Sequence, residues 1–340
     1  MSHHSASAHA GGELSYGAPT PGVPVFAAID LGTNNCRLLI ASPQAGGLQV
    51  LDTFSRVVRL GEGVSANAAL SPLAMDRAVE ALKICARKLS RYDIAAGRYV
   101  ATEACRRAKN CEDFILRIKR ETGLFVEIIP HEEEARLAFT GCTPLIRKDT
   151  ERAIIIDIGG GSTECMWTAR ENGDHRILAL DSTPCGVMRL TEQFGGSGLQ
   201  PRFHDMVAFV KEHVGRFDAS HGIAAALGQT GIQMLCTSGT VTTIAAIYLN
   251  LSRYDRAQVD GLRLSADSIR NVIATILAMD DASLRAHPCM GDDRADFMVA
   301  GCAILQAILD VWPLPEITIG DRGVREGIVF TLIREQSTGG

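Results

Sequence analysis

Two segments of the chain share one pattern of apolar and polar positions. Residues 26–41 and residues 153–168 each contain an apolar run, an Asp-x-Gly step with small polar residues, and a second apolar run. Such runs around residues that tolerate a positive φ predict a buried strand, a tight turn and a returning antiparallel strand. Either copy alone is compatible with an ordinary hairpin, but its recurrence about one small domain later favours a duplicated functional turn.

The rest of the chain predicts alternating strands and helices. In the first half we expect strands over 48–59, 99–102 and 124–129, and helices over 72–90, 111–122 and 130–140. In the second half we expect strands over 153–158, 164–168 and 176–180, and helices over 187–194, 203–217, 266–278, 293–312 and 323–335. The sequence therefore predicts an α/β fold in which helices cover sheets.

Length and composition agree with two soluble domains. The chain has 340 residues, of which 46% are hydrophobic, and we expect a disordered tail over 1–22 and domains over 23–149 and 150–335. No apolar stretch approaches the roughly 18 residues of a spanning helix, and residues 1–22 lack a signal peptide. The ten cysteines form no C-x-x-C pair. We therefore expect a cytoplasmic protein with reduced thiols and no membrane partner.

The composition of the two turns suits the binding of anionic oxygens. Glycines let backbone N–H groups approach such oxygens, hydroxyl and amide side chains add donors, and strand-end carboxylates hold a divalent cation. Asp30 and Asp157 are therefore candidate metal ligands. No G-x-x-x-x-G-K-[ST] motif is present, and the glycines at 159–161 lead into an apolar strand-like run, so a dinucleotide fingerprint does not fit.

The two turns resemble the phosphate-binding motifs of the actin, Hsp70 and sugar-kinase fold. Their sequences are DLGTNN from Asp30 and DIGGGSTE from Asp157. They are similar to the motifs of the exopolyphosphatase and guanosine pentaphosphate phosphohydrolase (Ppx/GppA) family. Further matches are TEACRRA from Thr102, EEARL from Glu133, TSGT from Thr237 and DRGVREG from Asp321. The resemblance covers roughly residues 24–335. It implies two actin-like (ribonuclease H-like) domains with a phosphate-binding cleft between them.

A helix expected from Pro130 carries the candidate general base. Glu132, Glu133 and Glu134 crowd its first turn, where acidic residues suit the helix dipole, and Glu132 with Arg136 would make an ordinary i,i+4 pair. Successive helical positions turn by about 100°, so the three cannot all face one way. The resemblance selects Glu134 as the base that deprotonates the attacking water.

The resemblance also implies a set of ligand-binding residues. Magnesium or another divalent cation would be held by Asp30, Asp157 and Glu164. The phosphate-binding residues would be Thr33, Asn34, Asn35, Arg106, Gly159, Gly160, Gly161, Ser162, Thr163, Gly239 and Thr240. Thr237 or Ser238 could equally be an ordinary helix cap. For the Asp321–Gly327 motif and for Arg294 with Asp296, structural and ligand-binding roles are both open.

The distribution of charge along the chain indicates which half would bind a polyanionic substrate. The net charge is −5, but residues 23–150 carry 18 Lys/Arg against 15 Asp/Glu, while residues 151–340 carry 16 against 23. A polyanion would more readily meet the first half. Together with the resemblance, which implies the activity, this leads us to expect a Mg²⁺-dependent exopolyphosphatase acting on inorganic polyphosphate. The alternatives are a guanosine pentaphosphate 5′-phosphohydrolase and a low-turnover sensor of alarmone or polyphosphate.

The sequence also bears on ligands and partners other than polyphosphate. ADP is a further candidate ligand near Thr237–Thr240, whereas no nucleic acid partner is expected. A homodimer is left open. A sugar-kinase-like transferase would need an acceptor-sugar site, for which the sequence has no candidate. From the length of 340 residues, we expect the two-domain core without the helical His-Asp domain that the resemblance implies for longer family members.

Overall fold

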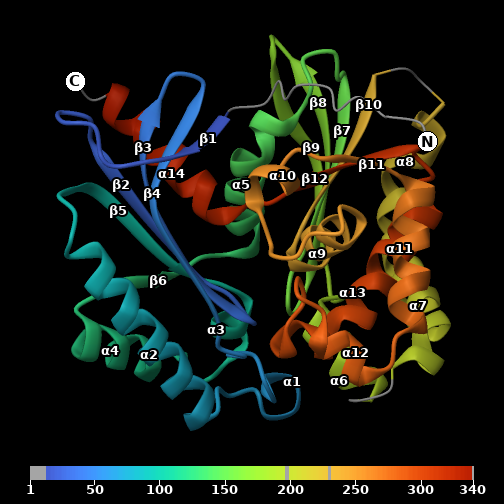
Figure 1. Ribbon diagram of the computed structural model, residues 1–340, viewed down its shortest axis with the longest axis horizontal. Helices are drawn as coiled ribbons and strands as arrows, with labels where there is room; N and C mark the ends of the chain where they lie inside the picture. The colour runs from blue at the N-terminus through green and yellow to red at the C-terminus, as the bar shows by residue number, and fades with distance from the viewer. Residues whose placement is uncertain (1–12, 196–198, 229–230, 339–340) are drawn as a thin grey trace.

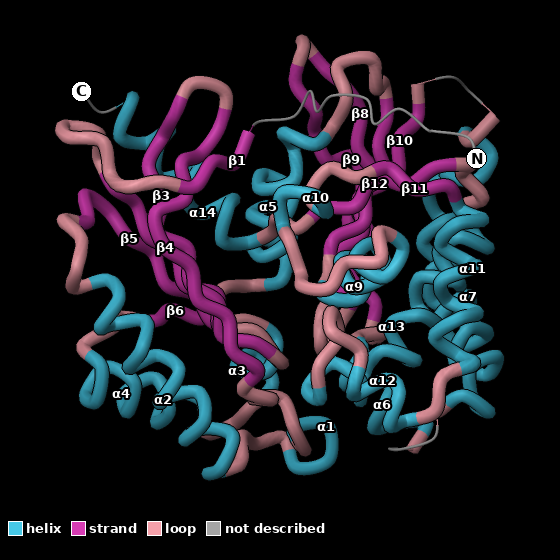
Figure 2. The backbone as a smooth tube through the Cα atoms, viewed as in Figure 1, coloured by secondary structure: helices cyan, strands magenta, loops and turns pink. Residues whose placement is uncertain are grey.

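The chain folds into two lobes, each built on a six-stranded sheet (Figure 1). The structure is a computed structural model that describes residues 13–195, 199–228 and 231–338. Figure 2 shows the strands in the interior of each lobe, helices on the outer faces, and two further helices between the lobes. No helix of these ranges is both long and apolar enough to cross a bilayer.

The first sheet has the strand order β1-β4-β3-β2-β5-β6. Its strands are β1 (Glu13–Tyr16), β2 (Val25–Leu31), β3 (Asn35–Gln44), β4 (Gly47–Val57), β5 (Ile94–Ala101) and β6 (Val126–Ile128). β2, β3 and β4 form an antiparallel meander, and β5 runs parallel to β2. On the outer face, α2 (Pro72–Leu89) and α4 (Cys111–Thr122) bury apolar side chains such as Leu82 and Phe114 in one core with Ile29.

The second sheet has the order β11-β12-β10-β7-β8-β9. Its strands are β7 (Arg152–Ile158), β8 (Thr163–Glu171), β9 (Asp174–Thr183), β10 (Ile232–Thr237), β11 (Arg263–Ser265) and β12 (Glu316–Gly320). The five strands β9-β8-β7-β10-β12 repeat the order and directions of β4-β3-β2-β5-β6. The duplicated sequence pattern therefore corresponds to a duplicated sheet.

Helices of the second lobe cover the outer face of its sheet (Figure 1). The longest are α7 (Phe203–His221), α11 (Ala266–Ala278) and α13 (Asp292–Val311), which share an apolar core with the sheet around the fully buried Trp312. The remaining helices are short: α1 (Val64–Asn67), α3 (Glu103–Arg107), α6 (Val187–Phe194), α8 (Ile223–Ala226), α9 (Gly239–Tyr248), α10 (Arg256–Val259), α12 (Asp281–Ala286) and 3-10 turns at Thr143–Leu145 and Gln200–Arg202.

Two helices, α5 (His131–Cys142) and α14 (Val324–Thr338), cross between the lobes. Their backbones approach closely: a Cβ on Gly327 would lie 1.9 Å from the Leu137 carbonyl oxygen, and a Cβ on Gly141 would lie 2.2 Å from the Gly323 carbonyl oxygen. Larger residues at these two positions would push the helices apart. The glycines therefore permit the close crossing that joins the lobes.

The observed elements match most of those expected from the pattern, but some differ. Of the tail over 1–22 that we expected to be disordered, residues 1–12 lie outside the described residues, whereas Glu13–Tyr16 form β1 and pair in parallel with β4. β10 was not predicted, because its short segment precedes the Thr237 motif without a periodic signal. The last helix, which we expected in the second domain, packs on the first sheet instead, where Val324, Ile328 and Val329 are buried with Phe26 and Ala28. The chain thus returns to its first lobe at its end, since the apolar side of α14 completes that core.

Candidate active site

The two predicted turns adopt the same geometry in the two lobes. In the β2–β3 turn the Gly32 N–H donates to the Asn35 carbonyl at 2.8 Å, and in the β7–β8 turn the Gly159 N–H donates to the Ser162 carbonyl at 2.9 Å. The turns also touch, because a Cβ on Gly160 would lie 3.3 Å from the Asn34 backbone nitrogen. The two phosphate-binding candidates therefore face each other across the lobes.

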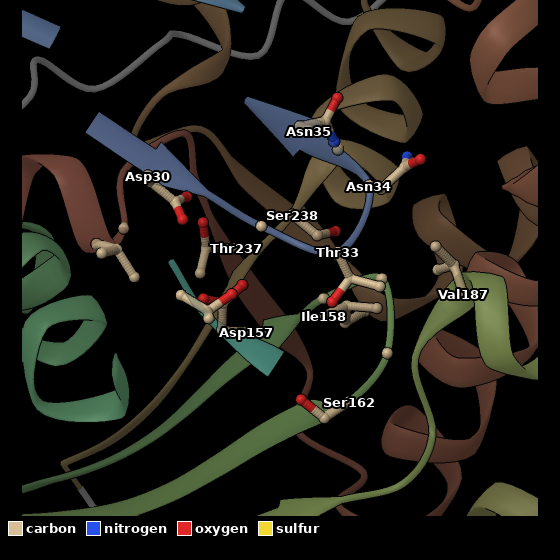
Figure 3. Close-up of a pocket in the computed structure, with 18 of the residues that line it drawn as sticks. Asp30, Thr33, Asn34, Asn35, Asp157, Ile158, Ser162, Val187, Thr237 and Ser238 are labelled. Carbon is tan, nitrogen blue, oxygen red and sulfur yellow. The ribbon is translucent and has the colours of Figure 1, made fainter. Parts of the chain in front are cut away.

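A cavity of about 140 Å³ lies between the lobes at these turns. Figure 3 shows Asp30 and Asp157 projecting toward each other from the ends of β2 and β7, with Thr237 beside them. The cavity is lined by most of the residues predicted from the sequence: Asp30, Thr33, Asn34, Asn35, Glu134, Asp157, Gly159, Gly160, Gly161, Ser162, Glu164, Gly239 and Thr240. Tertiary folding thus brings four segments that are far apart in the sequence to one site.

Four acidic side chains of the cavity have raised pKa values. Burial raises the pKa of Glu134 to about 8, and repulsion from Glu164 acts in the same direction. Burial also raises the pKa of Asp157 to about 7 and, with repulsion from Asp157, that of Glu164 to about 7. The pKa of Asp30 is raised by burial as well. Such a cluster of carboxyl groups favours a bound cation.

The helix α5 directs only one of its three consecutive glutamates into the cavity. Glu133 accepts a hydrogen bond from Arg98 at 2.6 Å, and Glu132 lies 3.2 Å from the His131 ring, so the expected Glu132–Arg136 pair is not the one formed. Glu134 lines the cavity and accepts a hydrogen bond from Arg106 at 2.7 Å. Burial gives Glu134 a pKa suited to proton transfer near neutral pH.

Two residues of the expected phosphate-binding set lie outside the cavity lining. The Arg106 guanidinium is engaged by Glu134 and by the Ile129 carbonyl at 2.9 Å, so it lies behind the carboxylate. The Thr163 hydroxyl is fully buried and donates to the Cys185 carbonyl at 2.8 Å. As Thr163 begins β8, strand alternation turns its side chain away from the cavity that its neighbours Ser162 and Glu164 line.

The cavity is also lined by three arginines, Arg37, Arg294 and Arg322. None of the three was singled out from the sequence for phosphate binding. Arg37 lies opposite Asp30 in the first hairpin, at the position that Glu164 occupies opposite Asp157 in the second. The same arginine lowers the pKa of both Asp30 and Asp157. Superimposing the two sequence repeats would have identified it, because the repeats place a cation and an anion at equivalent positions.

The Thr237–Thr240 motif combines the two roles that the sequence left open. The Ser238 hydroxyl caps α9 by accepting a hydrogen bond from the Val241 N–H at 3.0 Å. Ser238, Gly239 and Thr240 also line the cavity. The N-terminus of α9 is therefore directed at the cavity, where its backbone donors favour an anion.

The Asp321–Gly327 motif likewise combines two roles. Arg322 and Gly323 line the cavity, and the Arg322 guanidinium donates to Asp260 at 2.7 Å. Glu326 is fully buried. It accepts hydrogen bonds from Arg256 at 2.7 Å and from the Gly323 N–H at 2.9 Å. Although burial opposes ionisation, Arg325 and Arg256 lower the pKa of Glu326 to about 2. This ionic network fixes the start of α14 beside the cavity.

The carboxylates of the cavity do not form a preassembled metal cage. Within 13–195, 199–228 and 231–338, no group of three His, Cys, Asp or Glu side chains is arranged to hold a metal ion. Glu164 accepts hydrogen bonds from Ser162 at 2.6 Å and from Ser182 at 2.9 Å. Its orientation is therefore set by two hydroxyls, whereas Asp30 and Asp157 extend from the ends of β2 and β7 into the cavity.

Comparison with known proteins identifies the family. The sequence model described as the Ppx/GppA phosphatase family matches residues 39–336. Exopolyphosphatase 2 of Mycobacterium tuberculosis is 28% identical over 322 residues, which cover 90% of this chain and 98% of the relative. The guanosine-5′-triphosphate,3′-diphosphate pyrophosphatase of Aeromonas hydrophila is 28% identical over 316 residues, which cover 91% of this chain and 60% of that longer relative.

Solved structures lead to the same family. The crystal structure of the Aquifex aeolicus member of the Ppx/GppA family is 26% identical, has a TM-score of 0.76, and the match covers 92% of this chain and 99% of that one. An exopolyphosphatase-like protein is 29% identical with a TM-score of 0.81, and the match covers 91% of this chain and 97% of that one. The chain, with its duplicated turns and the acidic cavity between two like sheets, belongs to the Ppx/GppA phosphatase family.

Proposed function

We propose that this phosphatase is an exopolyphosphatase that removes the terminal phosphate of inorganic polyphosphate. The observation that carries the proposal is the placement of the Glu134 carboxylate, with a pKa of about 8, in a cavity lined by both phosphate-binding turns. The name of the M. tuberculosis relative, which matches over nearly its whole length, supports the same substrate.

The residues of the chain divide the work of hydrolysis between binding and proton transfer. Backbone N–H groups of the two turns bind phosphoryl oxygens, and Arg37 and Arg294 offset their charge. Ionised Glu134 accepts a proton from the water that attacks the terminal phosphorus. The bond from that phosphorus to the bridging oxygen breaks, so orthophosphate and the shortened chain, which keeps the bridging oxygen, are the products. Positioning and charge stabilisation supply most of the catalysis, as is usual for phosphoryl transfer.

The donor set of the cavity fits a hard divalent cation such as Mg²⁺. Asp30 and Asp157 are oxygen donors, and their pKa values are raised by burial, a cost that a cation would offset. Mg²⁺ commonly uses one or two carboxylates, several waters and substrate phosphates, so a cage of three protein ligands is not required. We propose Asp30 and Asp157 as ligands, with Glu164 nearby. Bound there, the cation would offset charge on the phosphate chain.

A second candidate substrate is guanosine pentaphosphate, whose 5′ end also presents a polyphosphate. The A. hydrophila relative carries the name of that activity, but this chain covers only 60% of its length. Val187, Phe297 and Met298 give the cavity an apolar part that could contact a nucleoside. ADP would meet the same groups.

The proposal is tested by measuring orthophosphate release from long-chain polyphosphate, guanosine pentaphosphate and ATP under identical conditions, with Mg²⁺ and with excess EDTA. We expect the largest kcat/KM for polyphosphate and no release in EDTA. Preference for guanosine pentaphosphate would establish the second candidate. Salt separates the two further, because affinity for a long polyanion falls more steeply with ionic strength than affinity for a short nucleotide.

Location and assembly are proposals as well. The ten cysteines are free and buried, as suits a reducing compartment, so we propose a cytoplasmic location. A homodimer is a further proposal that sedimentation would test.

A further inference from the structure

An ion pair connects the two lobes at the end of the cavity opposite α5 and α14. Arg59, in the segment between β4 and α1, donates to the Asp296 carboxylate of α13 at 2.7 Å. The Arg59 guanidinium also lies over the Phe297 ring, 5.4 Å from its centroid. Close by, the Gly63 N–H donates to Glu192 of α6 at 3.3 Å. Figure 1 shows α1 next to α6 at this end of the molecule and the crossing helices at the other.

The backbone of Arg59 is held in an unusual conformation directly behind the first phosphate-binding turn. Its φ is +46°, in the left-handed region that non-glycine residues rarely adopt. Its N–H donates to the Asn34 carbonyl at 3.0 Å, and its own carbonyl accepts a hydrogen bond from Arg77 at 3.2 Å. Strain of this kind persists where the surroundings hold it, and it often marks a functional position. Arg59 is therefore attached to the turn that binds phosphate.

The partner of Arg59 is attached to the opposite wall of the same cavity. Asp296 lies between Arg294, two residues before it, and Phe297, and both of these line the cavity. A second arginine, Arg285, donates to the other oxygen of Asp296 at 2.6 Å from within the second lobe. The Asp296 carboxylate is thereby oriented toward Arg59. The Arg59–Asp296 contact thus links the β2–β3 turn of the first lobe, which contains Asn34, to the part of α13 that lines the cavity in the second lobe.

We propose that Arg59 is a positioning residue whose pairing with Asp296 clasps the lobes shut over bound substrate, and this proposal rests on the proposed phosphohydrolase function. A phosphate chain that touches both the Asn34 turn and Arg294 needs the two lobes at one fixed separation. The clasp, made by Arg59 on Asp296 and on the Phe297 ring, lies beside both contacts. It stabilises the closed arrangement without touching the reacting atoms.

This role predicts a particular division between KM and kcat. When only the closed form binds tightly, the apparent affinity scales with the fraction of molecules that are closed. Loss of an ion pair that is partly exposed to solvent changes such an equilibrium by about two- to five-fold. Substrate that spans both lobes restores closure at saturation. The closed fraction changes by no more than the equilibrium constant itself. We therefore expect KM to rise by up to about five-fold while kcat stays near the wild-type value.

The test is a double-mutant cycle with Arg59→Gln and Asp296→Asn, measured by steady-state phosphate release from polyphosphate. Both single variants should raise KM, and the double variant should be no worse than the more affected single variant, because each change removes the same contact. Arg216→Gln is the matched control. Arg216 pairs with Glu212 one turn away on α7, within the second lobe and far from the cavity, so its loss should leave KM unchanged. Additive effects, or a fall in kcat without a change in KM, would overturn the clasp.

A measurement without turnover separates the clasp from the function on which it rests. Small-angle X-ray scattering of the substrate-free protein should give a larger radius of gyration for Arg59→Gln than for the wild type and for Arg216→Gln. Tripolyphosphate should reduce that difference. If the scattering changes as expected but polyphosphate is not hydrolysed, the clasp stands and the substrate proposal fails. If hydrolysis is found but the radius does not change, the clasp is wrong.

Discussion

The Arg106 guanidinium lies 2.7 Å from the Glu134 carboxylate, and Glu134 lines the cavity whereas Arg106 does not. The two side chains come from different segments, α3 and the first turn of α5, and both are largely buried. The resemblance implied that Arg106 touches phosphate directly. In this structure it contacts the candidate base.

This contact predicts how Arg106 affects the pH dependence of activity. Burial and repulsion from Glu164 raise the pKa of Glu134, whereas Arg106 lowers it. Arg106→Gln should raise that pKa further, so a smaller fraction of the base is ionised at pH 7. The acid limb of the kcat/KM profile should move to higher pH, with a larger loss of activity at pH 7 than at pH 9. Arg98→Gln, which removes the partner of Glu133, is the control. An unshifted acid limb would contradict the assignment.

Replacing Glu134 tests the identity of the base. Glu134→Gln keeps size and helix propensity but removes proton acceptance, so turnover should fall by roughly 10² to 10⁴-fold. Polyphosphate binding, measured by calorimetry, should survive, because the turns are unchanged. Glu132→Gln and Glu133→Gln change residues outside the cavity and should cost only about 0.3 to 1 kcal/mol of stability. Near wild-type turnover of Glu134→Gln, or equal losses in all three variants, would exclude Glu134 as the base.

Because of Asp157, the stability of the folded protein should depend on pH and on bound metal. Its pKa in the folded protein is raised to about 7 from an ordinary 3.8, so the folded state holds a proton that the unfolded state has released. Stability should therefore decline as pH rises from about 4 to about 7, and Glu134 and Glu164 act in the same direction.

Asp157→Asn removes this ionisation. At pH 8 without metal, its melting temperature should exceed that of the wild type by roughly 1 to 2 °C, the effect of about 1 kcal/mol on a chain of this length. Mg²⁺ should raise the melting temperature of the wild type but not that of the variant. The exposed Asp267, changed to Asn, serves as control. A variant that responds to Mg²⁺ like the wild type would show that Asp157 is not a ligand.

The crossing of α5 and α14 should be sensitive to a single methyl group. In Gly327→Ala the new Cβ would meet the Leu137 carbonyl oxygen, so we expect a loss of about 1 to 3 kcal/mol in the free energy of unfolding. Gly215→Ala is the matched control, because Gly215 lies inside α7 with open space around it. That variant should gain about 0.5 to 1 kcal/mol from helix propensity. Denaturant unfolding followed by circular dichroism would compare the two, and equal changes would contradict the close crossing.

The local pattern of apolar and polar residues was sufficient to predict most of the helices and strands and the two turns. The runs on either side of Asp30 and Asp157 predicted hairpins, and the structure contains them as β2–β3 and β7–β8. The α5 helix was predicted as well, along with the fact that its three glutamates point in different directions. These features depend on neighbours within a few residues, where periodicity and turn chemistry act directly.

The tertiary structure decided which of the candidate groups meet. The sequence suggested Arg106 and Thr163 as phosphate contacts, yet Glu134 engages the first and strand direction buries the second.

The sequence by itself determined the family, the duplicated turns and the chemistry available in them. Folding alone decided the pairing of Arg59 with Asp296, the packing of α14 on the first sheet, and the pKa values of the cavity carboxylates. The physical reason is that burial and Coulomb interactions depend on distances between segments far apart in the chain, and local patterns do not contain those distances.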